Sequence, residues 1–335
     1  MGIRISDIAK MAKVSTGTVD RVIHNRGKVS EEKYIRVKKV LKEIDYKPNL
    51  LARALANSAI QYITVVIPEY EHDPYWSLVY EGIQQAIQEN NYSVKIDFIC
   101  YKQQDSETFP TALKRVEKCS GVILATHFGA KVKQLAQQLD EQDIPYVFID
   151  SNLPDLNCLS YVGTDSFQSG SIAARFALLE AGKDGQIITV NVGIEESFTT
   201  QKRKRKEGFI SFLEAKGYKG EVKSFELPLH LDKLVSILDE SGTSLVVFDS
   251  KIYKVYELLR DKDIKGKISL IGYDLVGPNI KGVKEGGIDY LISQSPKLQG
   301  YTSVKNLVEF LVLGIDPSSL RMPIQIYVKE NIEYI

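Results

Sequence analysis

The chain has 335 residues, which is enough for two or three compact units with a sizeable core. Its contents of 44% hydrophobic and 26% charged residues are ordinary for a globular protein. The sequence has neither the apolar stretch of a signal peptide at its start nor a run of ~18 consecutive apolar residues. We therefore expect no membrane segment and a cytoplasmic location.

The net charge of zero hides two regions of opposite charge. Residues 1–57 hold 13 Lys and Arg against 6 Asp and Glu (net +7), and residues 58–335 hold 30 against 37 (net −7). This asymmetry predicts a polyanionic partner for the N-terminal end only. The three cysteines, Cys100, Cys119 and Cys158, lack metal-ligand spacing, so we interpret them as reduced core thiols and expect no metal.

Three short helical patterns are predicted in residues 1–47. Ser6, Ser15 and Ser30 are candidate N-caps of the three helices, and Glu31 and Glu32 suit the start of the third. The apolar positions at helical spacing are Ile8, Met11 and Ala12 in the first helix, Val19, Val22 and Ile23 in the second, and Val37, Val40, Leu41 and Ile44 in the third.

The first two helices are separated only by about Lys13–Ser15, so they must cross sharply. In a helix-turn-helix the second helix lies in the major groove of DNA, and its outer face must be polar. Arg21 is predicted to face outward there, with a side chain able to bond guanine or phosphate. The alternative is a small three-helix domain that binds another protein.

The segments DIAKMAKVS, TVDRV, VSEE, YKPN and ALA together form a long and specific signature. They resemble, without a gap from Ile5 to Ala56, the LacI/GalR (lac repressor) family of bacterial transcription regulators. The resemblance implies that the chain binds double-stranded DNA. In that family the residues at the positions of Thr16, Gly17 and Arg21 contact bases.

The resemblance also implies a hinge helix at about Asn49–Ala56 that enters the minor groove, with Leu55 inserted between the central base pairs. A helix of this length is marginal alone in water, so it would fold only when bound to DNA and to its partner copy. The alternative role for Leu55 is interdomain packing. The predicted DNA contacts are Ser15, Thr16, Gly17, Thr18, Arg21, Asn25, Asn49, Arg53 and Leu55.

The sequence departs from this family at two positions of the second helix. It has Asp20 where the family usually has Ser, and His24 where it usually has Asn. A carboxylate near phosphates is repulsive, so Asp20 is expected to organise Arg21 or Lys13. Gly17 has no side chain with which to contact a base, and the operator sequence therefore stays open.

From Ile60 onward the chain alternates buried-strand patterns with helical ones. YITVVIP, SVKIDFI, GVILAT and IPYVFID are typical of parallel strands, and EGIQQAIQE of a helix between them. After VGTD the pattern restarts with QIITVNV, EVKSFEL, SLVVFD, KISLIGYD and DYLIS. Two doubly wound halves predict a ligand cleft between them at the carboxyl ends of the strands. No G-x-G-x-x-G follows the first strand, so we expect no dinucleotide and no other cofactor.

This region resembles sugar-binding periplasmic proteins and the effector domains of the same repressor family. The resemblance is carried by DPYW, FID, VGTDSFQSG, RKEGF, IGYD and ISQSP. It implies an α-helical DNA-binding domain (1–47), a hinge (48–59) and a Rossmann-like two-lobed body of periplasmic binding protein type I (60–335). The first lobe would span about 60–163 and 295–322, and the second about 164–294 and 323–335. The implied ligand contacts are Asp73, Tyr75, Trp76, Asp150, Arg205, Ser250, Asp274 and Gln294.

The residue types at these positions suit a carbohydrate or polyol. Carboxylates accept pairs of hydroxyl hydrogen bonds, Arg donates a rigid fork, and Tyr or Trp stacks on the sugar ring. The alternative for each Asp is a cap on the following helix. Arg205 lies in the basic run QKRKRKEGF, whose other members are expected to form a solvated face.

Two departures from ribose-type proteins concern the ligand. Ser151 stands where those proteins have Arg after the first cleft Asp, and Ser250 with Lys251 stands where the family usually has an Asn-Asp pair. Ribose is therefore not predicted. A phosphorylated sugar has no support from the motifs, because no second basic residue in them converges on Arg205.

We interpret the chain as a transcription regulator, by expectation a repressor, whose operator affinity is controlled by a carbohydrate or polyol. It would act as a homodimer on a pseudo-palindromic operator. One alternative is a sugar-binding transport protein, which the basic N-terminal segment disfavours. Another is a carbohydrate-processing enzyme with Asp150 and Asp274 as its acid and base. The effector, the operator and the sign of the response stay open.

We predict that Leu55→Gly weakens specific operator binding while leaving ligand affinity intact, because it removes the apolar side chain that would open the central base step. Footprinting on a specific operator, with calorimetric ligand titration as the control, measures both effects. An unchanged footprint would contradict the insertion of Leu55.

Overall fold

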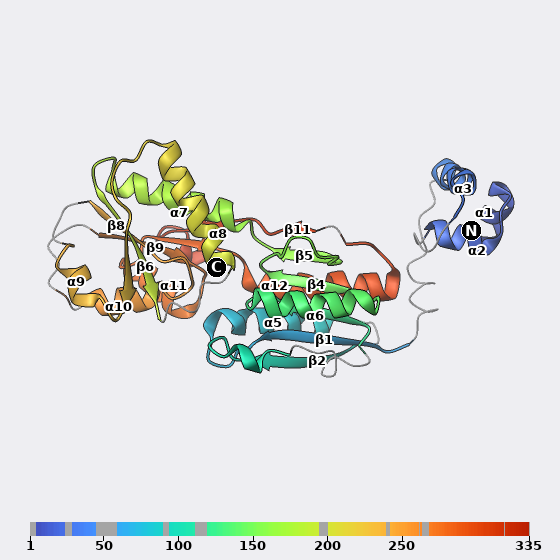
Figure 1. Cartoon of the computed structure of the whole chain (residues 1–335), viewed down its shortest axis with the longest axis horizontal. Helices are drawn as coiled ribbons and strands as arrows, with labels where there is room; N and C mark the ends of the chain where they lie inside the picture. The colour runs from blue at the N-terminus through green and yellow to red at the C-terminus, as the bar shows by residue number, and fades with distance from the viewer. Residues whose placement is uncertain are drawn as a thin grey trace. The chain divides into compact units, whose positions relative to one another are not determined.

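The computed structural model describes residues 5–23, 29–44, 59–89, 94–110, 119–193, 200–238, 242–260, 262, 268–317 and 319–334 (Figure 1). The chain divides into two compact units. One consists of Met1–Ala59 with Glu309–Ile315, and the other of Ile60–Val308 with Asp316–Ile335. We refer to the described residues 5–44 as the head and to the second unit as the body.

The head contains three helices, α1 (Ile5–Ala12), α2 (Thr16–Ile23) and α3 (Glu31–Glu43). The turn between α1 and α2 places Lys13 in the left-handed region, at φ 55°, and the amide of Val14 donates to the carbonyl of Ala9 at 3.0 Å. The sharp turn is therefore closed by backbone hydrogen bonds. The side chains buried between the three helices are Ile8, Ala9, Ala12, Val19, Val22, Val37 and Val40.

Three details of the head concern the predicted caps and core. Ser15 caps α2 as predicted, since its Oγ accepts from the amide of Thr18 at 3.2 Å. Ser6 lies inside α1 and is not its cap, and Ser30 stands at the N-cap of α3 without a side-chain cap bond. The prediction that Met11 packs in the core was wrong. It is 52% exposed, because positions 5, 8, 9 and 12 form the inner face of α1.

Lobe 1 of the body is built on a parallel sheet with strand order β11-β5-β4-β3-β1-β2. Its strands are β1 (Gln61–Pro68), β2 (Val94–Tyr101), β3 (Gly121–Ala125), β4 (Tyr146–Asp150), β5 (Ser160–Gly163) and β11 (Leu320–Arg321). Lobe 2 repeats this arrangement with the order β12-β10-β9-β8-β6-β7, in which only the edge strand β12 is antiparallel. Its strands are β6 (Gln186–Val192), β7 (Lys223–Leu227), β8 (Thr243–Val246), β9 (Ile268–Tyr273), β10 (Tyr290–Ser293) and β12 (Gln325–Tyr327).

The nine predicted strands are all present, and the body is doubly wound as expected. The short strands β5, β11 and β12 were not predicted. β11 and β12 have only two and three residues, and β5 has just two strand-forming residues between a serine and a glycine, so none of them carries a clear apolar run. In each sheet the order reverses beside the first strand, between β1 and β3 and between β6 and β8. Such switch points open a crevice at the carboxyl ends of the strands.

Helices lie on both faces of each sheet. Lobe 1 carries α5 (Pro74–Glu89), α6 (Gly129–Glu141), α12 (Pro296–Val308) and a short 3-10 turn (Ser106–Thr108). A π-helical turn (Glu309–Leu313) follows α12 in the chain and belongs to the first unit. Lobe 2 carries α7 (Ser166–Ala181), α8 (Thr200–Ala215), α9 (Leu231–Val235), α10 (Ile252–Arg260), α11 (Gly277–Lys284) and a 3-10 turn (Ile332–Tyr334).

Paired glycines allow two helix pairs to pack backbone against backbone. In lobe 2, a methyl group on Gly208 of α8 would overlap the carbonyl of Phe167 on α7, and one on Gly170 of α7 would overlap the carbonyl of Arg205 on α8. Helices α5 and α12 of lobe 1 meet in the same way through two further glycines, Gly82 and Gly300. The close approach of α7 and α8 fixes the position of Arg205.

In the described chain, three segments connect the lobes, between β5 and α7, between β10 and α12, and between β11 and β12. Hydrogen bonds hold these segments together. The amide of Met322 donates to the carbonyl of Gly163 at 2.8 Å, and Gln299 Nε2 donates to the carbonyl of Gln294 at 2.9 Å. This triple connection is the place where the two lobes can rotate relative to each other.

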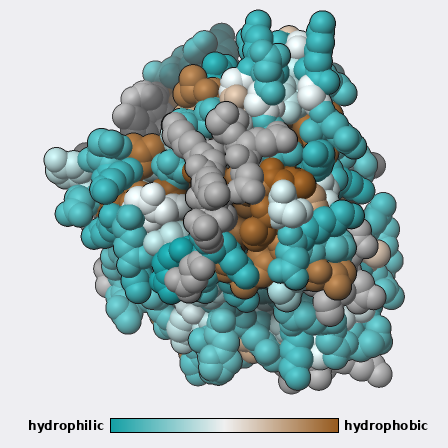
Figure 2. Space-filling model, turned by 90° about the vertical axis from the view of Figure 1, so that its left-hand side faces the viewer, coloured by the Kyte–Doolittle hydropathy of each residue, from teal (hydrophilic) through white to brown (hydrophobic). Residues whose placement is uncertain are grey.

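The outer face of lobe 2 is largely hydrophilic, with a hydrophobic area near its centre (Figure 2). No helix within the described ranges is both long and apolar enough to cross a membrane.

We predict that Gly208→Ala destabilises the body by about 1–3 kcal/mol, because the added methyl group must push α7 and α8 apart. Gly277→Ala is the matched control. Gly277 begins α11 with open space around it, so we expect a change of at most about 1 kcal/mol in the stabilising direction. Urea unfolding of both variants measures the difference. Equal stabilities would contradict the tight helix contact.

Candidate functional site

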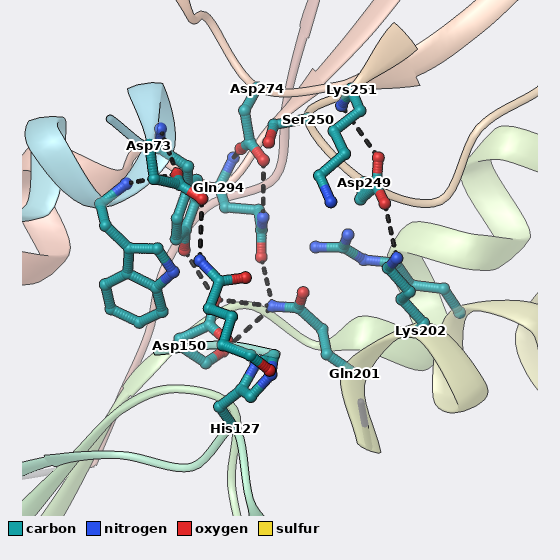
Figure 3. A pocket seen from close by; sticks show the side chains of 14 residues that line it. Asp73, His127, Asp150, Gln201, Lys202, Asp249, Ser250, Lys251, Asp274 and Gln294 are labelled. Atoms are coloured by element: carbon teal, nitrogen blue, oxygen red, sulfur yellow. Dashed lines mark hydrogen bonds and ion pairs between the residues drawn. The ribbon is translucent and has the colours of Figure 1, made fainter. Parts of the chain in front are cut away.

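A cavity of about 80 Å³ lies in the body where the carboxyl ends of the strands of both lobes meet. All eight predicted ligand contacts line this cavity, and six further residues complete its wall. The lining residues are Asp73, Tyr75, Trp76, Gln103, His127, Asp150, Gln201, Lys202, Arg205, Asp249, Ser250, Lys251, Asp274 and Gln294 (Figure 3). That they contact a ligand stays a prediction.

Asp73 joins the cavity wall as the cap of α5. Its Oδ1 accepts from the amides of Tyr75 at 2.9 Å and Trp76 at 3.1 Å, and its Oδ2 accepts from Gln103 Nε2 at 2.8 Å. The alternative considered for each aspartate, a helix cap, therefore applies to this one. Its main effect is to fix the first turn of α5, from which Tyr75 and Trp76 face the cavity.

Asp150 and Asp274 are not helix caps. Asp150 ends β4 of lobe 1, and Asp274 follows β9 of lobe 2. Both adopt left-handed backbone conformations, with φ of 76° and 67°. Aspartate tolerates this region better than most residues, and such strained positions cluster at binding sites. The two lobes thus present equivalent carboxylates from equivalent strand ends.

A chain of hydrogen bonds joins these two carboxylates across the lobes (Figure 3). Gln201 Nε2, on α8, donates to Asp150 Oδ1 at 2.9 Å and to Gln294 Oε1 at 2.7 Å. Gln294 Nε2 in turn donates to Asp274 Oδ2 at 2.9 Å. Tyr75 donates its hydroxyl to Asp150 Oδ1 at 2.6 Å. The side chains of Gln201 and Gln294 therefore bridge the two aspartates across the cavity.

Burial dominates the ionisation of both aspartates. It raises the pKa of Asp150, although Tyr75 and Arg205 oppose the rise. It raises the pKa of Asp274 to about 6, and here Arg205 and the donors of Gln294 oppose the rise. Burial next to Asp150 also raises the pKa of Tyr75, so its hydroxyl stays a donor.

Arg205 is fully buried on α8, at 1% exposure. Its Nη1 donates to the carbonyl of Phe248 at 2.6 Å, and its guanidinium stacks over the ring of Tyr273 at 3.9 Å. Its Nε and Nη2 are buried without a hydrogen-bond partner among the described residues. An unpartnered buried donor is costly, so this edge of the guanidinium is prepared for an acceptor from outside the chain.

Three further charged residues form the lobe 2 wall beside Arg205. Lys202 Nζ pairs with Asp249 Oδ2 at 2.6 Å, and both side chains are mostly buried. The amide of Lys251 donates to Asp249 Oδ1 at 2.9 Å. Burial alone would raise the pKa of Asp249, but the ammonium groups of Lys202 and Lys251 hold it below its ordinary value. The expectation that the neighbours of Arg205 form only a solvated face was wrong for Lys202.

His127 and Gln103 belong to the opposite wall, in lobe 1. His127 Nε2 contacts the carbonyl of Gln103 at 3.2 Å. Burial lowers the pKa of His127, the Gln103 carbonyl and Asp150 oppose this, and Lys202 and Lys251 lower it further. A neutral imidazole beside a carboxamide gives this wall hydrogen-bonding groups without a fixed charge.

Ser151 and Ser250 behave differently although both were predicted to alter ligand contacts. Ser151 is buried, and its Oγ lies 2.6 Å from Thr126 Oγ1, so it does not line the cavity. Ser250 does line it. The departure at Ser151 therefore replaces a ligand contact by a bond inside lobe 1, whereas the departure at Ser250 and Lys251 changes the cavity itself.

Sequence reasoning missed six lining residues. A usable signal existed for Asp249, which ends the apolar run SLVVFD just as Asp150 and Asp274 end theirs. His127 follows GVILAT at the carboxyl end of β3, where the same argument applies. The others, Gln103, Gln201, Lys202 and Lys251, lie in loops or early helix turns whose direction no local pattern indicates.

The head presents a second candidate surface on α2. Ser15, Thr16, Gly17 and Arg21 are exposed and Thr18 is half-buried, while Val19 and Val22 face the core. Beside them a groove is lined by Lys10, Lys13 and Lys33 among other residues. The predicted contacts Asn25, Asn49, Arg53 and Leu55, the hinge helix and His24 lie outside the described residues.

Comparison with known families matches both parts of the chain. The model described as "Bacterial regulatory proteins, lacI family" matches residues 4–49, and the one described as "Periplasmic binding protein domain" matches residues 63–314. The HTH-type transcriptional regulator MalR of Streptococcus pneumoniae is 27% identical over 293 residues, covering 82% of this chain and 87% of its own. The ribose operon repressor of Lactococcus lactis is 24% identical over 277 residues, covering 81% and 80%.

Solved structures agree with this result. A protein from Bacteroides fragilis assigned as a LacI transcriptional regulator is 29% identical, with a TM-score of 0.76 over 83% of this chain and 100% of that chain. The Caulobacter myo-inositol binding protein has a TM-score of 0.71 over 82% of this chain and 95% of its own, at 16% identity, which shows a shared fold.

We predict that the buried charge of Asp274 destabilises the body above about pH 6. A carboxyl group whose pKa rises from 3.8 to about 6 on folding binds its proton more tightly in the folded state. Its unfavourable contribution is then relieved as the pH falls through 6 toward 4. The free energy of unfolding of the wild type, minus that of Asp274→Asn, should rise by up to about 3 kcal/mol between pH 7 and pH 4. Denaturant titrations at both pH values measure it, and a constant difference would contradict the burial of this charge.

Proposed function

This chain belongs to the lacI family of bacterial regulatory proteins, and we propose that it is a transcriptional repressor controlled by a small polar ligand in the body cavity. A sugar or polyol is the ligand class that we infer. The observation that carries the proposal is that one chain combines an exposed polar helix α2 with a closed cavity between two lobes.

The head has what a DNA-contacting helix requires. Val19 and Val22 hold α2 against the other two helices, and the opposite side exposes Arg21 next to small polar side chains. Small residues let the helix approach base edges closely, and Arg21 offers donors to guanine or phosphate. The net charge of +7 over residues 1–57 would attract the DNA backbone.

The cavity has what a polyhydroxylated ligand requires. Asp150 and Asp274 offer carboxylate oxygens from opposite lobes, Arg205 offers unpartnered donors, and the side chains of Tyr75 and Trp76 offer aromatic surface. A ligand in contact with both lobes changes the equilibrium between their open and closed arrangements by its difference in affinity. In a homodimer bound through both heads, that shift would alter operator affinity, and the coupling is reciprocal.

The glycosidase alternative finds less support in the site. Asp150 and Asp274 do face one cavity, but each is engaged by an amide side chain of Gln201 or Gln294. The relatives reported above are transcription regulators. Turnover of a bound sugar would be the observation that revives this alternative.

The test is binding of the full-length chain to a palindrome from the upstream region of its own gene, followed by fluorescence anisotropy. We expect at least one member of a panel of sugars and polyols to change the operator affinity tenfold or more, about 1.4 kcal/mol of coupling.

Two variants control this measurement. Arg21→Ala should weaken operator binding at least tenfold while ligand affinity stays intact, whereas Lys39→Ala, which removes an exposed charge from α3, should weaken it less. Equal binding of the palindrome and a scrambled duplex would contradict the proposal for the head. Operator affinity that no panel member changes would contradict the proposal for the cavity.

A further inference from the structure

We propose that the effector carries an anionic group, a carboxylate or a phosphate, which binds between Arg205 and Lys251 at the lobe 2 end of the cavity. This inference rests on the proposed function, since it names the chemical class of the ligand of the same cavity.

Arg205 supplies the first half of the anion site. The residue is 1% exposed, one Nη1 bond to the carbonyl of Phe248 anchors its guanidinium, and Nε and Nη2 lack hydrogen-bond partners within the described chain. These two nitrogens lie on the same edge of the guanidinium. They therefore form the fork that matches two oxygens of a carboxylate or phosphate.

Lys251 supplies the second half. Asp249 lies in the same wall and interacts electrostatically with the Lys251 ammonium, but its Oδ2 pairs with Lys202 Nζ at 2.6 Å, and its Oδ1 accepts the Lys251 amide. No described carboxylate lies within ion-pair distance of the Lys251 ammonium. Figure 3 shows this side chain extending into the cavity. The wall therefore has more cations than anions.

One imidazole and two carboxylates face this wall. His127 faces Lys202 and Lys251 from lobe 1, and burial together with these two lysines lowers its pKa, which disfavours a further positive charge there. Asp150 and Asp274 interact electrostatically with Arg205, and each also accepts a hydrogen bond from Gln201 or Gln294. The cavity thus has carboxylate acceptors for hydroxyl groups at one end. At the other end are the Nε and Nη2 donors of Arg205, which have no hydrogen-bond partner in the described chain, and the ammonium of Lys251, which has no ion pair there.

The sequence departure at Ser250 and Lys251 has a physical meaning in this arrangement. Where the resembling proteins usually have an Asn-Asp pair, this chain has a serine and a lysine. This departure places an ammonium group among the residues that line the cavity together with Arg205. The prediction that no second basic residue of the motifs converges on Arg205 is not contradicted, because Lys202 and Lys251, which line the same cavity, lie outside those motifs.

The experiment compares neutral sugars with their anionic counterparts by calorimetric titration of the full-length chain. The probes are D-glucose, D-glucuronate and D-glucose 6-phosphate, with the corresponding galactose series and myo-inositol as further members. We expect the anionic member of at least one series to bind tenfold or more tightly than the neutral one, about 1.4 kcal/mol. Preference for the uronate or for the phosphate ester identifies which anion the site takes.

Variants locate the anion within the cavity. Lys251→Met should weaken binding of the preferred anionic sugar at least tenfold and change binding of its neutral counterpart less than twofold, and Lys251→Arg should retain most of the affinity. Lys281→Met is the matched control, since it removes one positive charge from α11 of the same lobe, where the side chain is 72% exposed. It should leave both affinities unchanged.

Two results would overturn the inference, and only the second would also contradict the proposed function. In the first result, each neutral sugar binds more tightly than its anionic counterparts, and Lys251→Met has no effect on binding. This result contradicts the anion site and leaves the proposed function standing. If no probe binds and none changes operator affinity, both proposals fail.

Discussion

The hydrogen-bonded chain from Asp150 through Gln201 and Gln294 to Asp274 is the interaction on which the arrangement of the body depends. It begins on lobe 1, crosses to α8 of lobe 2, passes the connecting segment at Gln294 and ends on lobe 2. Buried amides hold both carboxylates in place at a low local dielectric, where each bond is strong and each loss is costly. The contact between the two lobes at the cavity is therefore made by directional hydrogen bonds between polar side chains.

Much of the fold and part of the site could be predicted because parallel strands place their ends at one edge. Asp150 and Asp274 follow apolar runs, so the sequence alone locates them there. Arg205 and Gln294 were predicted only through resemblance, because helical position and loop direction depend on packing. Gln201, which joins the lobes, gives no local signal at all, since its role exists only once α8 has packed on α7 through Gly208 and Gly170.

The errors made from the sequence share one cause. The residues of a segment do not reveal which distant side chains will bind them in the folded chain. Lys202 lies in a run that looks like a solvated basic face, yet it is paired with Asp249 forty-seven positions later. Ser151 looks like an altered ligand contact, yet Thr126 from the neighbouring strand end engages it. In each case the partner lies outside the segment that was interpreted.

The same dependence on partners determines how a ligand could act. A ligand that binds Asp150 Oδ1 or Asp274 Oδ2 competes with Gln201 or Gln294, so part of its gross binding energy is offset by bonds that the chain already makes. Arg205 is different, because its Nε and Nη2 have no described partner to lose, so an acceptor placed there gains the full interaction. We therefore expect most of the ligand affinity to come from Arg205, and the change in lobe arrangement to come from Gln201 and Gln294. Binding and switching are thereby separated within one cavity, and a substitution at Gln201 changes the equilibrium between lobe arrangements without removing the guanidinium that holds the ligand.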